Sequence, residues 1–132
     1  MSAPLAPRSV SSSRALVFAA LSYLVVGVLM FIPMPHGEGP PLIPHLDKFV
    51  HVGCWALLGL ATLFAISRSR LATRGLLLAV LAASVFGVLV ELFQGLTSTR
   101  SADPWDAFAD TVGAILGALA ALFIESRTGT RI

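Results

Sequence analysis

The sequence predicts an all-α, polytopic membrane protein in which four transmembrane helices pack as a small bundle with both termini in the cytoplasm. Apolar residues make up 56% of the 132 residues and charged residues only 12%, whereas a soluble domain is about a quarter charged. The apolar residues are gathered into four long runs, and the basic residues lie mostly beyond alternate ends of these runs. These observations set the fold class and the orientation.

Each apolar run approaches the length of about 20 residues that a helix needs to cross a bilayer core. A segment inside lipid has to hydrogen-bond its own backbone, so we expect each run to be helical. The first run stops at Pro33 and is long for a cleaved signal peptide, so it is interpreted as a helix that is retained. The expected helices cover residues 15–32, 49–66, 75–96 and 107–124 of one domain, 15–124, between a disordered tail at 1–14 and a tail at 125–132.

The basic residues predict which side of the membrane each loop occupies. Positive charges concentrate in cytoplasmic segments of membrane proteins. Only Lys48 and Arg100 fall on the other side, which places loops 33–48 and 97–106 outside a bacterial cytoplasmic membrane. The seven basic residues assigned to the cytoplasm are Arg8, Arg14, Arg68, Arg70, Arg74, Arg127 and Arg131.

Composition also excludes several classes of function. The net charge is only +2, and no basic cluster or aromatic platform indicates nucleic acid as a partner. Cys54 is the single cysteine, so neither an intramolecular disulfide nor a cysteine-based zinc site can form. The lipid bilayer is the expected partner, and the oligomeric state is left open.

Polar side chains gather at the expected outer ends of three helices that are far apart in the sequence. Within each helix, members that are three or four residues apart share one face, and Arg100 follows the second of these helices in the loop. Charged groups inside a membrane are costly, so they should face the bundle interior and find partners there. Such a network either only joins the helices or lines a pocket open to the outer leaflet, and its mixture of acids, base and imidazole favours the pocket. Its members are Asp47, Lys48 and His51, then Glu91, Gln94 and Arg100, then Asp106 and Asp110.

In this order the motifs resemble those of the VanZ-like family of bacterial membrane proteins, over roughly residues 46–120. That family shows Asp-Lys-x-x-His, then Glu-x-x-Gln with an Arg in the next loop, then Asp-x-x-x-Asn-x-x-Gly-x-x-x-Gly. Asp110 stands where the family usually has Asn, an extra acid that bears on the charge and metal affinity of the pocket. The matching residues here are Asp47, Lys48, His51, Glu91, Gln94, Arg100, Asp106, Gly113 and Gly117.

The family takes its name from a member linked to resistance to the glycopeptide teicoplanin. The resemblance therefore implies a role in the cell envelope near lipid or cell-wall precursors, with an effect on glycopeptide sensitivity as one expectation. We expect the pocket to bind or act on a lipid-linked or cell-envelope molecule, and whether the protein is an enzyme is left open.

The residue types suggest a division of roles within this pocket. His51 is the candidate general acid or base, with Glu91 or Asp106 as its carboxylate partner. Lys48 and Arg100 are candidates for holding an anionic headgroup. No cofactor is expected, and the less favoured alternative is a divalent metal held by oxygen and imidazole ligands. The further headgroup-binding candidates are Asp47, Gln94 and Asp110, and the metal alternative draws on Asp47, His51, Glu91 and Asp106.

Two other functions compete with this hypothesis. A small transporter or lipid-moving protein would use buried acids and histidine, but the inner halves of the four runs lack charge. A non-enzymatic partner of a larger envelope complex would use the Gly113-x-x-x-Gly117 stripe, which is typical of close helix contacts.

Other small and aromatic residues carry predictions about packing. Gly53 and Gly59 are expected to lie at helix contacts as well. Trp55 and Trp105 are expected to face lipid or the membrane interface.

Overall fold

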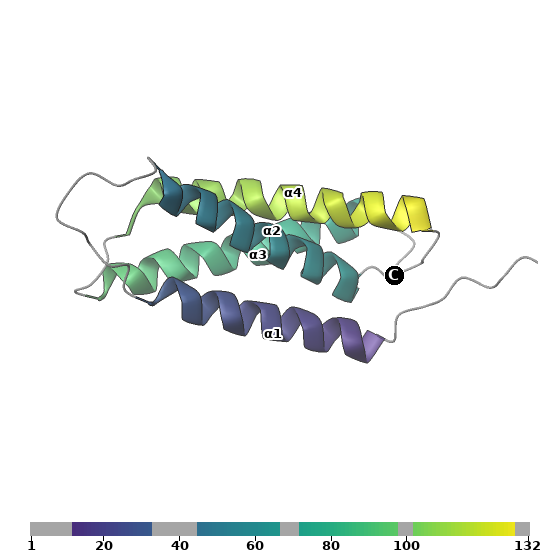
Figure 1. Ribbon diagram of the computed structural model, residues 1–132, viewed down its shortest axis with the longest axis horizontal. Helices are drawn as coiled ribbons and strands as arrows, with labels where there is room; N and C mark the ends of the chain where they lie inside the picture. Colours follow the sequence, from purple (N-terminus) through teal and green to yellow (C-terminus); the bar gives the residue numbers. More distant parts are fainter. Residues whose placement is uncertain (1–11, 33–44, 67–71, 98–101, 129–132) are drawn as a thin grey trace, which may run out of the picture.

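The computed structural model describes residues 12–32, 45–66, 72–97 and 102–128, and these form four antiparallel helices with no strand among them (Figure 1). All four helices are long and apolar enough to cross a membrane, which confirms the predicted all-α, multi-pass class. Their bounds are α1 Ser12–Met30, α2 Leu46–Ile66, α3 Ala72–Gly95 and α4 Pro104–Thr128.

All four helices begin three residues, about one turn, before the predicted apolar runs. The extra residues are polar or helix-initiating ones, such as Asp47 and Lys48 at the start of α2 and Pro104 at the start of α4, where proline is tolerated. Residues 12–14 and 125–128 therefore belong to helices, although the sequence assigned them to tails. Hydropathy detects the part of a helix that lies in lipid, and here the first turn of each helix and the last turn of α4 extend beyond it. The remainder of both tails lies outside the described residues.

Helix α2 lies at the centre of the bundle. It packs on α1, α3 and most extensively on α4, and it supplies the fully buried Trp55 and Leu58 to the core. Large apolar side chains remain exposed on every helix, as lipid-facing residues do; examples are Leu24, Leu57, Leu77 and Leu116.

Glycines set the close approach of α2 to α4. A Cβ atom added at Gly113 would collide with the backbone carbonyl of Val52, and one added at Gly117 would collide with that of Ala56. A Cβ at Gly59 would likewise meet the backbone of Ala114. The Gly113-x-x-x-Gly117 stripe is thus a contact surface within this chain, in the manner of small-residue contacts between transmembrane helices.

The structure contradicts two of the packing expectations. Gly53 has no atom within 4 Å of the place where its Cβ would stand, so it faces open space rather than a helix. Trp55 is 0% exposed, and its indole N–H donates to the Ala83 carbonyl of α3 over 2.9 Å. It therefore lies in the core, whereas Trp105 is exposed as expected.

Two of the interhelical hydrogen bonds among the described residues join α1 to its neighbours. The hydroxyl groups of Tyr23 and Thr62 share one of 2.9 Å, and the Gln94 amide donates to the Met30 carbonyl over 2.7 Å. The first joins the middle of α1 to the last part of α2, and the second joins the end of α1 to the end of α3. Together they fix the position of α1 beside the other three helices.

We expect the Tyr23–Thr62 hydrogen bond to contribute modestly to stability. In a double-mutant cycle with Tyr23→Phe and Thr62→Val, the coupling free energy should be about 0.6 kcal/mol, the average for hydrogen bonds between transmembrane helices. Unfolding of the four proteins in mixed micelles, followed by circular dichroism, measures it. A coupling near zero would show that the two hydroxyl groups find equivalent partners when separated.

Candidate functional site

The polar residues meet at one end of the bundle, where α1 and α3 end and α2 and α4 begin; we call this the polar end (Figure 1). His51 lies five residues after the start of α2, Glu91 four residues before the end of α3, and Asp110 six residues after the start of α4. At 1.5 Å per residue, these positions are about 6–9 Å inside the helix ends. The site is therefore one to two turns deep rather than at the surface.

The outer part of the site is an ion-pair cluster around Lys48, which we call the clamp. The Lys48 ammonium group lies 2.7 Å from Asp106, 2.8 Å from Asp103 and 3.2 Å from Asp47. These contacts join the first turn of α2 to the first turn of α4 and to the residue that precedes it. Because its ammonium group already has three carboxylate partners, Lys48 can take an anionic headgroup only by exchanging one of them.

Asp103 connects three helices. One oxygen of its carboxylate accepts from Lys48 of α2, and the other accepts from the Trp105 backbone N–H over 2.9 Å, which caps the start of α4. Its own backbone N–H donates to the Glu91 carboxylate of α3 over 2.9 Å. The hydrogen bond from Lys48, followed by that from the Trp105 backbone, lowers the pKa of the Asp103 carboxyl, so this group stays ionised.

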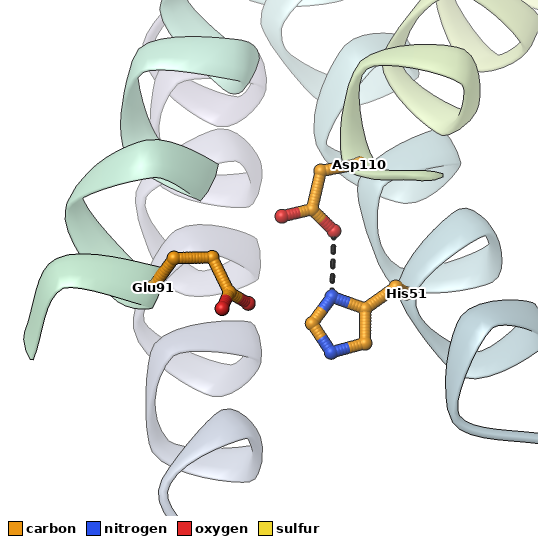
Figure 2. A group of neighbouring side chains, drawn as sticks. All are labelled: His51, Glu91 and Asp110. Carbon is orange, nitrogen blue, oxygen red and sulfur yellow. Dashed lines mark hydrogen bonds and ion pairs between the residues drawn. The ribbon is translucent and has the colours of Figure 1, made fainter. Parts of the chain in front are cut away.

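The inner part of the site consists of His51, Glu91 and Asp110, which we call the buried triad. Figure 2 shows the three side chains converging from α2, α3 and α4. They are 1%, 5% and 0% exposed, respectively. His51 Nδ1 lies 2.7 Å from Asp110 Oδ1, and the His51 ring is stacked on Trp55 with centroids 5.5 Å apart. The ring is therefore held both at its edge and on its face.

The buried triad leaves polar atoms without partners. Within the described residues, these atoms are His51 Nε2, Glu91 Oε1 and Asp110 Oδ2. Outside the triad, the described residues hold one further buried side-chain atom without a partner, Ser84 Oγ, seven residues before Glu91 on α3. An ionised Asp110 can only accept, so the neutral imidazole carries its hydrogen on Nδ1 and a lone pair on Nε2. That lone pair can take a proton or bind a cation. Asp106 Oδ2 is the nearby carboxylate oxygen, 3.8 Å from Nε2.

Gly87 provides the space for the Asp110 carboxylate. A Cβ atom at Gly87 would stand 2.6 Å from Asp110 Oδ2 and 2.9 Å from Trp55 Nε1. Gly87 precedes Glu91 by one turn on the same face of α3, so any side chain there would enter the buried triad. A single glycine in an apolar run gave no signal of this role.

An apolar groove of about 810 Å³ lies between α1 and α3. It extends from Tyr23, in the middle of α1, to Phe31 and Phe93 at the polar end. Its lining is aromatic and aliphatic, a chemistry that suits a hydrocarbon chain. The residues that line it are Tyr23, Leu24, Gly27, Val28, Phe31, Ile32, Phe86, Leu89, Val90 and Phe93.

In a comparison with protein families, residues 7–125 match the VanZ/LLP1 family. This match agrees with the ordered polar motifs and with the four-helix bundle. The chain belongs to the VanZ/LLP1 family. The match covers most of the sequence and all of the bundle except the last three residues of α4, so the VanZ-like resemblance is confirmed. No curated protein and no solved structure matches the chain.

The VanZ-like motif residues divide between the clamp, the buried triad and helix packing. Asp47 and Lys48 belong to the clamp, and Asp106 contacts both Lys48 and, more distantly, His51. Gln94 is buried but donates to α1 rather than to the triad. Arg100 lies outside the described residues.

Two features of this VanZ-like site differ from the sequence-based assignment of roles. The carboxylate that hydrogen-bonds His51 is Asp110, where the sequence suggested Glu91 or Asp106 as partner. Asp103 is also part of the site, although it is not among the residues that the sequence predicts for the site. Its spacing of three residues from Asp106 was the signal that could have placed it there.

Proposed function

We propose that the polar end faces the extracytoplasmic side of a bacterial cytoplasmic membrane and that the buried triad binds or acts on a lipid-linked or cell-envelope molecule. Family membership and the four spans support the membrane part of this proposal. The observation that carries the rest is the set of unpartnered atoms on His51, Glu91 and Asp110.

Those atoms favour a ligand site over a network that only joins helices. A joining network gains stability by pairing its polar groups, as the clamp does around Lys48. A buried polar group left without a partner costs about 1–3 kcal/mol. Three such atoms within one site therefore favour a ligand that supplies the missing partners, because an intramembrane ionisable residue of purely structural role would be paired.

His51 is the residue best placed to do chemistry on this ligand. Asp110 holds the ring through Nδ1, which leaves the Nε2 lone pair to exchange a proton with a bound molecule as a general base. Glu91, on the opposite wall, is the second acid-base group. The groove between α1 and α3 supports a lipid-linked ligand, because it offers a place for a hydrocarbon chain that ends at the same end of the bundle.

The two competing functions receive less support from the geometry. The Gly113–Gly117 stripe is used between α2 and α4, so it no longer argues for docking onto a larger complex. A transport path would need polar groups beyond the triad, and among the described residues Ser84 is the one unpartnered polar side chain deeper in the bundle.

His51→Asn and Glu91→Gln test the proposal. We expect both variants, at normal protein level, to lose the lipids that co-purify with the wild-type chain in mild detergent, identified by mass spectrometry. Cells that depend on the protein should also change their sensitivity to teicoplanin. The matched controls are His45→Asn, an exposed histidine, and Glu125→Gln, near the other end of α4. Unchanged lipid content and drug sensitivity in both variants would exclude the proposed site.

A further inference from the structure

The geometry points to a divalent-cation site formed by His51, Glu91 and Asp110, with a first-row transition ion such as Zn²⁺ or Mn²⁺ as its occupant. Each of these residues offers one ligand atom, and the three atoms lie within 4.8 Å of one another. This ion site deepens the proposed function, and the chemical role of the ion rests on that function. Binding of the ion itself can be measured independently of it.

The three ligands come from three helices and point into one space (Figure 2). All are at least nine-tenths buried, and each has an atom without a partner within the described residues. A cluster of exposed acids is common without an ion, but buried carboxylates in lipid are rare and are paired. One ligand atom from each of the three residues lies within 4.8 Å of the other two, so a single cation between them could contact all three residues.

The charges of the site favour a cation with two positive charges. A neutral His51 with ionised Glu91 and Asp110 carries a charge of −2, which one divalent ion balances. The Lys48 ammonium group is the nearest fixed positive charge on the described residues, and Asp47, Asp103 and Asp106 already surround it. The clamp therefore cannot neutralise the triad as well, and buried charges are stable only when they are paired or bind metals.

The ligand types narrow the choice of ion. Imidazole together with carboxylate suits Zn²⁺ and Mn²⁺, while Mg²⁺ keeps most of its water and prefers oxygen ligands alone. Three protein ligands leave a coordination position open, as in catalytic rather than structural zinc sites. Asp106 Oδ2, 3.8 Å from His51 Nε2, lies close enough to complete the set after a small movement. While this coordination position is open, the ion would polarise a phosphoryl or carbonyl oxygen of the bound molecule.

The competing occupant is a buried water molecule. Water can also bridge several polar groups in a small polar cavity, but it brings no charge to balance the two carboxylates. The two occupants differ in one measurable respect, because only the ion is removed by a chelator and restored by a metal salt.

The test uses the full chain purified in mild detergent, freed of metal with EDTA and titrated with Zn²⁺ and separately with Mn²⁺ by calorimetry. We expect one ion per chain and a rise in unfolding temperature when the ion is restored. Glu91→Gln and Asp110→Asn preserve side-chain size and should weaken binding at least about tenfold, since even groups that only support metal ligands contribute about 10–100-fold. His51→Asn should do the same.

Controls and a spectroscopic readout separate lost ligation from lost folding. His45→Asn and Glu125→Gln remove an exposed histidine and a distant carboxylate and should bind the ion as the wild type does. With Co²⁺ as probe, the wild-type chain should show visible absorption bands of a bound ion, and Asp110→Asn should shift or abolish them while its circular dichroism stays unchanged.

Absence of saturable Zn²⁺ and Mn²⁺ binding by the wild-type chain would overturn the inference, as would equal loss of affinity in the control variants. If the chain binds no ion but His51→Asn still loses its lipids, the ion proposal fails and the proposed function stands. If ion binding behaves as expected while lipid content and drug sensitivity are unchanged in every triad variant, the proposed function fails and the ion site stands.

Discussion

Replacing Gly117 by leucine is expected to separate α2 from α4 and to lower the free energy of unfolding by about 3 kcal/mol or more. Overpacking a core costs about 1–3 kcal/mol when neighbouring side chains can adjust. Here the first added carbon would already collide with the Ala56 backbone carbonyl, and a helix backbone cannot move aside without carrying its helix with it. Leucine is a good helix former, so the loss would not come from helix propensity.

The matched control for this variant is Gly53→Leu, the same substitution on α2. Gly53 faces open space, so this change should leave stability equal or raise it by up to about 1 kcal/mol through helix propensity. Unfolding of the two variants in mixed micelles, followed by circular dichroism, compares them directly. Equal stability of Gly117→Leu and the wild type would mean that α2 and α4 do not approach as closely as the structure shows.

The contrast between these glycines shows what the sequence could predict about packing. Gly53 and Gly59 are six residues apart, which is about 240° around a helix at 3.6 residues per turn, so they cannot share a contact face. His51, Trp55 and Gly59 recur every four residues and do share one. The same periodicity could have placed Trp55 in the core, but the general preference of tryptophan for the interface outweighed it.

The fold was predictable because a bilayer permits few alternatives. Four apolar runs of spanning length must be helices, and alternation of direction then brings the starts of the second and fourth runs to the end of the third. The meeting of His51, Glu91 and Asp110 at one end follows from this topology alone. Their pairing does not, because it depends on how far each helix is rotated about its own axis.

The internal division of the site was therefore beyond the sequence. Glu91 and Gln94 are three residues apart on α3, yet Glu91 belongs to the buried triad and Gln94 donates to the Met30 carbonyl of α1. Asp110 was singled out because Asn usually stands there in the resembling family, and the structure places it against His51. An Asn side chain at that position could accept from His51 but would bring no charge, so this chain differs from the usual pattern in the charge of the triad.

Replacing Lys48 by methionine is the second change with a large expected effect. It removes the cation from between three carboxylates, of which Asp106 is the most buried, and should lower the free energy of unfolding by about 2 kcal/mol. That value lies between about 0–1 kcal/mol for exposed ion pairs and about 3–5 kcal/mol for breaking buried ones, because Lys48 is 28% exposed. Lys48→Arg, which keeps the charge, should lose much less.

A second substitution tests whether the loss comes from the unbalanced acids. Adding Asp106→Asn to Lys48→Met removes the carboxylate that most needs the cation, so the double variant should be more stable than the sum of the two single changes, since residues of one ion-pair network couple. The measurement is unfolding in mixed micelles together with the lipid content of each purified variant. Unaltered stability with lost lipid would instead assign Lys48 to headgroup binding, and the clamp would then be an arrangement that the ligand displaces.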